Sequence, residues 1–258
     1  TKQDIFNENI QILKLLRKWI DIDPKNIPKL LANTLVSLSE SSEDLIKKAV
    51  IENLRKLAIS NPELAAWSGA IRILVDAIID PTTREMSEPL TYTLLFLVND
   101  PASRNAVKSH LDFTKIFSLF TDIDYPVESK DGKKDHLVKF ENQLEMAKKA
   151  IMILLKSWTG LIYLGNEKTS LSSLIMALKQ PIKPIIRSAI YDIINEILTI
   201  GIKNIPKHTY DFQVNNLINY YLMVLVHLLM DCGLFNVLIE LSGLEDIEIS
   251  QPAQKYLK

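Results

Sequence analysis

The stretch ENLRKLAISNPELAAWSGAIRILVDAI, from Glu52 to Ile78, decides the fold of this chain. Its apolar residues recur three or four positions apart, which is the spacing of one face of an α-helix. Asn61-Pro62 is a helix-start signal, because the asparagine can cap a helix and the proline fits its first position. Gly69 precedes a second apolar run, and we expect it to open the long third helix of a unit at a crowded turn. The stretch therefore predicts helices joined by tight turns.

The same helical spacing extends over almost the whole chain. Further start signals stand at Ser87-Glu88-Pro89 and at Asp100-Pro101. Strands are not indicated, because no run alternates convincingly between apolar and polar residues and no Asn-Gly or Asp-Gly pair joins two β-type runs. The chain is therefore predicted to be all-α.

The helical segments also repeat. The apolar pattern that begins at Gly69 returns from Leu111, from Thr169 and, over a shorter length, from Gly233. The spacing from Gly69 to Leu111 matches the period of about 40–47 residues that armadillo and HEAT repeats have. A second pattern, in which an apolar residue follows an alanine by five positions, aligns three segments (Ala49, Ala150 and Ala189). Glu52 to Ile78 resembles the junction of an armadillo unit, a feature of the repeat class that carries no particular function.

Stacking of these units is required, because one pair of helices cannot bury both of its apolar faces. We therefore expect residues 1–258 to form a single armadillo-like domain, an armadillo/HEAT-like helical repeat solenoid or α-α superhelix. The segment 123–142 is expected to be a flexible insertion, since its VESKDGKKD sequence has the composition of a mobile loop.

Composition excludes several classes of function. Lys and Arg number 30 against 31 Asp and Glu, so the basic excess of a nucleic-acid-binding protein is absent. The single cysteine, Cys232, allows no internal disulfide and fits a reducing compartment. The seven glycines are too far apart for a phosphate-binding loop. Phe212 to Met230 is apolar over too short a length for a membrane span, so we expect a helix buried within protein.

Reactive side chains form no recognisable cluster in the sequence. The four histidines fit no HExxH or Cys/His pattern (His110, His136, His208 and His227). Cys232 precedes Gly233 at an expected helix junction and is interpreted as a small buried hydrophobe rather than a nucleophile. We therefore expect no catalytic residue, no metal ligand and no cofactor.

The polar break Ser157-Trp158-Thr159-Gly160 admits three interpretations: a nucleophile on a tight turn, a kink in a membrane helix, or a joint between two buried helices. A nucleophile elbow needs G-x-S-x-G between a strand and a helix, and here the preceding segment is helical and Leu155 stands where the first glycine would be. We interpret the break as a structural joint with Trp158 filling the space between two helices.

The segment that contains this break resembles one family. SWTGLIYL, from Ser157 to Leu164, is similar to a signature of the N-terminal region of the Rictor/Pianissimo family, the scaffold subunit of TOR complex 2. Other segments follow that family's order along nearly the whole chain (NPELAAWSGAIRILVDAIID, SEPLTYTLLFLVNDPASRN, LDFTKIFSLFTD, IRSAIYDIINEIL and NYYLMVLVHLLMDCGLFNVLIEL). The match is poorer between Gly201 and Gln213.

The resemblance implies a function that composition does not. Members of the family are non-catalytic and hold the TOR kinase, the Sin1-type subunit and other TOR complex 2 subunits in one assembly. It implies protein partners and a cytoplasmic location, and it leaves open membrane association through the complex. No catalytic residue and no partner-contact residue carries over to a position of this chain. Four arginines are candidates only as expected surface positions (Arg55, Arg72, Arg84 and Arg104).

Two other hypotheses remain. An armadillo adaptor that binds extended peptides, as transport receptors do, would carry an asparagine in LxNLA. Alignment of LRKLA and INEIL places Lys56 and Glu196 at that position, which argues against this activity. A helical enzyme with an unrecognised site is the third hypothesis.

Overall fold

The computed structural model describes residues 2–121, 133–155, 157, 160, 164, 171–203, 223–224 and 226–257. These residues form helices joined by short turns, with no strand among them, so the predicted all-α fold is confirmed. The chain divides into two compact units, Thr1–Lys115 and Ile116–Lys258. The prediction of one domain over residues 1–258 stays a prediction.

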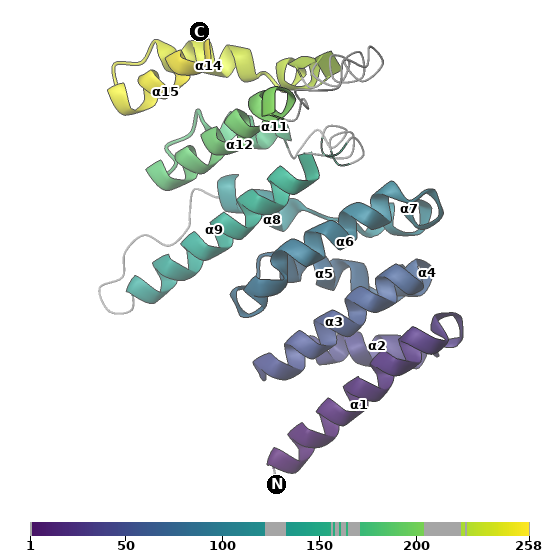
Figure 1. Ribbon diagram of the computed structural model, residues 1–258. Coiled ribbons are helices and arrows are strands. Elements are labelled where there is room, and N and C mark those ends of the chain that lie inside the picture. The colour runs from purple at the N-terminus through teal and green to yellow at the C-terminus, as the bar shows by residue number, and fades with distance from the viewer. Residues whose placement is uncertain are drawn as a thin grey trace. The chain divides into compact units, whose positions relative to one another are not determined.

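The first unit consists of three layers of helices (Figure 1). Its long helices α1, α3 and α6 lie side by side, with α3 between the other two, and α2 and α5 lie on one side of them. The short helices α4 and α7 contact each other at the end of the layers. The bounds are α1 Lys2–Ile22, α2 Lys29–Leu38, α3 Asp44–Ser60, α4 Pro62–Ser68, α5 Ala70–Ile78, α6 Ser87–Asn99 and α7 Pro101–Val107, with short 3-10 helices at Pro24–Asn26, Pro81–Met86 and Lys108–His110.

The repeating unit is a long helix, a short helix and a third helix, which the sequence α3, α4, α5 illustrates. The third helix starts directly after Gly69, as predicted, but it is not the long one. Helix α5 has 9 residues, whereas α3 has 17. The surface made by adjacent long helices therefore belongs to α1, α3 and α6, each of which is followed by an Asp-Pro or Asn-Pro pair.

In the described part of the second unit, long helices again pack against each other. Helix α9 packs against α12, α11 against α14, and α14 against α15. The bounds are α9 Lys133–Leu155, α11 Leu171–Ala177, α12 Pro184–Lys203, α14 Leu234–Ser242 and α15 Ile247–Leu257, and α8 (Thr114–Thr121) begins at the border of the two units.

The repeated apolar pattern marks the core in three of its four predicted copies. All five pattern positions of the copies at Gly69, Leu111 and Thr169 are buried (Ile71, Leu74, Val75, Ala77, Ile78; Phe113, Ile116, Phe117, Leu119, Phe120; Leu171, Leu174, Ile175, Ala177, Leu178). The copy at Gly233 is confirmed at two of its four positions. Leu238 and Leu241 are buried, whereas Phe235 and Ile239 are 53% and 48% exposed and the neighbouring Leu234 and Val237 are buried in their place. The buried face of α14 is therefore displaced from the predicted one, and adjacent faces are hard to distinguish in so apolar a helix.

Part of the predicted insertion at 123–142 is helical. Residues from Lys133 onward belong to α9, which buries Phe140 and Leu144 on one face, so the loop prediction is wrong for 133–142. A charged first turn followed by apolar residues at helical spacing explains this outcome. Residues 122–132 lie outside the described residues.

Candidate protein-interaction surface

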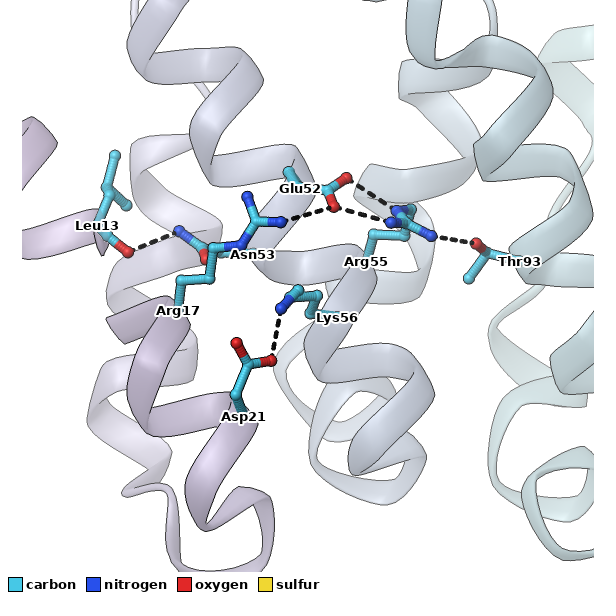
Figure 2. Close-up of polar contacts among 8 residues, drawn as sticks. All are labelled: Leu13, Arg17, Asp21, Glu52, Asn53, Arg55, Lys56 and Thr93. Atoms are coloured by element: carbon cyan, nitrogen blue, oxygen red, sulfur yellow. Dashed lines mark hydrogen bonds and ion pairs between the residues drawn. The ribbon is translucent and has the colours of Figure 1, made fainter. Parts of the chain in front are cut away.

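Charged side chains connect adjacent long helices of the first unit (Figure 2). The Arg55 guanidinium on α3 donates two hydrogen bonds of 2.8 Å to the Glu52 carboxylate and a third, of 3.4 Å, to the hydroxyl of Thr93 on α6. The Glu52 carboxylate also forms an ion pair with Arg17 on α1, with 3.6 Å between Oε1 and Nη2. We call these residues, with the ion pair between Lys56 and Asp21, the α3 ladder. The ladder links all three layers of the unit.

The electrostatics of the ladder follow from these contacts. Hydrogen bonding from Arg55 lowers the pKa of the Glu52 carboxyl, although partial burial opposes the shift. The same bond raises the pKa of the Arg55 guanidinium. Both groups are therefore charged at neutral pH, and a half-buried bidentate pair of this kind holds its geometry better than a fully exposed one.

The ladder occupies the positions where a peptide-binding armadillo receptor would carry its asparagine. Lys56 stands at that position, and its ammonium group is paired with Asp21. The neighbouring asparagine, Asn53, is 2% exposed, and its side-chain amide donates to the Leu13 carbonyl of α1 at 3.2 Å. Its Oδ1 atom has no hydrogen-bond partner. The only asparagine of α3 thus lies between two helices and is not presented to a peptide.

Helix α6 presents a different side-chain chemistry at the corresponding positions. Helices α3 and α6 bury the same apolar pattern, so that Leu54 aligns with Leu94. In this alignment Tyr92 and Phe96 of α6 correspond to Glu52 and Lys56 of α3. The two rings are one helical turn apart and 53% and 51% exposed. Sequence reasoning missed this pair, although its spacing of four residues on an otherwise well-buried helix is a usable signal.

Asn61 and Pro62 begin α4 as predicted. The Asn61 side chain accepts a hydrogen bond of 3.0 Å from the Leu64 backbone N–H. Its amide also donates to the Pro24 carbonyl at 2.9 Å, which ties the second layer to the first. Asp100 caps α7 in the same way, accepting from the Ser103 backbone N–H at 3.0 Å. These residues are structural, because their polar atoms are engaged within the repeat.

Gly69 and Gly233 share one backbone conformation. Their φ angles are +84° and +81°, in the left-handed region that side chains with a Cβ atom disfavour. Each precedes the third helix of its unit. The expected crowding at Gly69 is absent, because a Cβ there would meet nothing within 4 Å. Backbone conformation alone therefore explains this glycine.

Ser157 and Gly160 form a helix joint. The Ser157 hydroxyl donates to the Leu154 carbonyl at 3.2 Å and accepts from the Gly160 backbone N–H at 2.9 Å. A Cβ at Gly160 would lie 2.1 Å from the Leu154 carbonyl oxygen, so only glycine fits. The hydroxyl is thus used as a cap, which favours the joint over the nucleophile. Trp158 and Thr159 lie outside the described residues, and the plug role of Trp158 stays a prediction.

The remaining candidates show no sign of chemistry. Burial raises the pKa of the half-buried Cys232 thiol, with a further contribution from Asp231, so the thiol is protonated at neutral pH. His110 and His227 are exposed, and the His227 ring nitrogen Nδ1 lies 2.7 Å from the Met223 carbonyl. Within the described ranges, no three His, Cys, Asp or Glu side chains gather as metal ligands. His208 and the His136 side chain lie outside the description.

The arginines expected at the surface differ in their surroundings. Arg72 is exposed, whereas Arg55 belongs to the α3 ladder. Arg104 donates to the Val98 and Asn99 carbonyls at 2.6 Å and 2.7 Å and so covers the C-terminal end of α6. Arg104 therefore has a structural role. The sequence alone could not separate these cases, because the burial of a long side chain depends on the neighbouring layer.

No helix of the described part of the chain has both the length and the apolar character that crossing a membrane requires. Most of the segment Phe212 to Met230, predicted as a helix buried within protein, lies outside the described residues.

Comparisons with known proteins point to one family. Residues 1–210 match the family described as "Rapamycin-insensitive companion of mTOR, N-term". The chain is 27% identical over 268 residues to protein pianissimo A of Dictyostelium discoideum, covering 92% of this chain and 23% of that protein. It is 30% identical over 194 residues to the rapamycin-insensitive companion of mTOR of Mus musculus, covering 72% and 11%. It is 27% identical over 160 residues to the target of rapamycin complex 2 subunit ste20 of Schizosaccharomyces pombe, covering 58% and 12%. The chain thus spans less than a quarter of the length of these relatives.

Proposed function

Because this chain belongs to the family of the N-terminal region of the rapamycin-insensitive companion of mTOR, we propose that it is part of a non-catalytic scaffold subunit of TOR complex 2. One relative is named as a subunit of target of rapamycin complex 2. In this proposal the chain binds the TOR kinase, the Sin1-type subunit or both, supports TOR signalling as part of the complex, and acts in the cytoplasm.

The exposed pair Tyr92 and Phe96 is the observation that carries the proposal. The two rings are half exposed, although the other side of their helix is well packed. Their contact with water is unfavourable in the free chain, and a partner that covers them would bury their apolar surface. The Arg55 guanidinium donates to the hydroxyl of Thr93, the residue that follows Tyr92 in the sequence. Aromatic side chains and arginine are the residues that most often dominate binding energy at interfaces between proteins. We propose this surface of α3 and α6 as a contact site for a partner subunit.

The peptide-adaptor alternative is less well supported. A receptor that reads the backbone of an extended peptide needs free amide groups at regular positions along the groove. In the first unit the corresponding position of α3 is Lys56, paired with Asp21, and that of α6 is Phe96. Both residues favour side-chain contacts with a folded partner.

The test is a pull-down of the chain against each separately purified subunit of the complex, followed by cross-link mapping. The wild-type chain is expected to retain at least one subunit, and Tyr92→Ala/Phe96→Ala is expected to lose most of that retention. Trp67→Ala is the matched control, because Trp67 is 52% exposed but lies on α4. Retention of no subunit by the wild-type chain would contradict the scaffold role, and equal retention by the double variant would contradict the assignment of the surface.

A further inference from the structure

The long helices of the first unit carry one row of equivalent positions that recurs from layer to layer. The helices are aligned by the Asp-Pro and Asn-Pro pairs after α1 and α3, and by the buried leucines of α3 and α6. In this alignment each helix contributes two residues one turn apart, which are Lys14 and Lys18 on α1, Glu52 and Lys56 on α3, and Tyr92 and Phe96 on α6. We call these six residues the outward row.

The outward row points away from the neighbouring layers. Asn53 donates to a backbone carbonyl of α1 and Arg55 donates to a hydroxyl of α6, and these two contacts leave α3 on opposite sides (Figure 2). At 3.6 residues per turn, the two α3 residues of the row lie between Asn53 and Arg55 and opposite Leu54, which is fully buried. A further layer at either end of the unit would stack on the sides that Asn53 and Arg55 mark, so it would leave the row uncovered.

The charges of the outward row are paired in its middle and unpaired at its α1 end. Glu52 and Lys56 are both paired within the α3 ladder. Lys14 and Lys18 are exposed, and neither forms an ion pair with a described residue. Two lysines four residues apart on a helix repel each other, so an acidic group beside them would be favourable. The row therefore presents apolar rings on α6 and two unpaired positive charges on α1.

We propose that the partner segment that covers Tyr92 and Phe96 continues across α3 and places aspartate or glutamate side chains over Lys14 and Lys18. Packed helix axes lie about 8–10 Å apart, so the axes of α1 and α6 are about 16–20 Å apart. An extended segment of about six residues covers that distance. The inference rests on the proposed function, because it concerns the same surface, and it adds the chemistry of the partner: apolar at one end and acidic at the other.

Isothermal titration of the subunit retained in the pull-down tests the charges of the row. Lys14→Glu/Lys18→Glu is expected to weaken the Kd at least about tenfold, or about 1.4 kcal/mol. The melting temperature should stay the same, because glutamate and lysine have similar helix propensities. Lys25→Glu/Lys139→Glu makes the same change in net charge at exposed positions outside the row and should leave the Kd nearly unchanged. If the charge-reversed variant does not fold, Lys14→Gln/Lys18→Gln tests the same contact with a smaller expected loss.

Carbodiimide cross-linking identifies what lies over the two lysines, because the reagent joins an amine to a carboxyl group in direct contact. We expect mass spectrometry to find Lys14 or Lys18 linked to an aspartate or glutamate of the retained subunit, and Tyr92→Ala/Phe96→Ala to lose that link. Links only to carboxylates of this chain, in the same or a second copy, would overturn the inference.

The titration separates a failure of the inference from a failure of the proposed function. If Tyr92→Ala/Phe96→Ala weakens binding but Lys14→Glu/Lys18→Glu has the wild-type Kd, the inference is overturned and the proposed contact on α3 and α6 stands. If the wild-type chain retains no subunit, both are overturned.

Discussion

Two glycines of this chain are required for different reasons, and the difference can be measured. Gly69 needs its left-handed backbone, since φ is +84° and a Cβ would meet open space. Gly160 needs the absence of a side chain, since a Cβ would overlap the Leu154 carbonyl oxygen. The first requirement concerns conformation and the second concerns packing.

Gly69→Val is expected to lower the free energy of unfolding by about 2 kcal/mol or more, because a β-branched residue is strained at positive φ. Denaturation by urea measures the change. Gly243→Ala serves as control, because the φ angle of Gly243 is −89° and a Cβ there would meet its nearest atom at 3.7 Å. Equal stability of the valine variant and the wild type would mean that α4 and α5 are joined differently.

Gly160→Ala is expected to cost about 1–3 kcal/mol, the range for forcing extra atoms into a packed site. Ser157→Ala removes only the cap and is expected to cost about 1 kcal/mol. Thermal unfolding of both variants, followed by circular dichroism, provides the comparison. A loss for Gly160→Ala no larger than that for Ser157→Ala would contradict the close approach of the two backbone segments.

At the scale of helices, Asn61 has two functions that a pair of variants can separate. Asn61→Ala removes both the cap of α4 and the hydrogen bond to the Pro24 carbonyl, and we expect a loss of about 1–2 kcal/mol. Asn61→Asp keeps an acceptor for the Leu64 backbone N–H and adds a negative charge at a helix N-terminus, so its loss should be smaller. Equal losses in urea denaturation would show that the link between the layers, and not the cap, dominates.

The α3 ladder makes stability depend on pH. The pKa of Glu52 is lowered in the folded chain, mainly by the hydrogen bond from Arg55, and the pKa of Asp80 is also lowered, by Lys47 and Thr82 against a large opposing effect of burial. Groups with a lowered folded-state pKa stabilise the fold above their unfolded pKa, and the stabilisation is lost as pH falls. The melting temperature should therefore decrease below about pH 4.5.

Glu52→Gln tests the origin of that decrease. The variant is expected to melt at a lower temperature than wild type at pH 7 and to approach it at acidic pH, because protonated Glu52 can no longer pair with Arg55 and Arg17. Glu245→Gln, at an exposed loop position, is the control. A difference in melting temperature between Glu52→Gln and wild type that stays the same from pH 7 into the acidic range would contradict the role of the ladder.

The sequence predicts local features of the helices better than contacts between neighbouring layers. The cap at Asn61, the break at Gly69 and the core positions of α5, α8 and α11 follow from local residue types and spacing, and they are confirmed. The exposure of Phe235 and the burial of Asn53 depend on how far each helix is rotated toward its neighbour. Sequence spacing does not determine that rotation when a helix is apolar on more than one face. The pairing of Lys56 with Asp21 has the same cause, because it joins residues 35 positions apart in adjacent layers.

At the scale of the whole molecule, the first unit joins its layers through the α3 ladder and exposes the aromatic pair Tyr92 and Phe96 on α6. No cluster of metal-ligand side chains lies within the part of the chain that the structure describes. An exposed aromatic pair on an otherwise well-packed helix is typical of a surface that contacts another protein.

The proposed contact between the α3 and α6 surface and a subunit of TOR complex 2 can be measured by isothermal titration of the subunit retained in the pull-down into the purified chain. We expect a measurable Kd that Tyr92→Ala/Phe96→Ala weakens at least about tenfold, or about 1.4 kcal/mol, without a change in melting temperature. The same Kd for the double variant and the wild-type chain would contradict this contact.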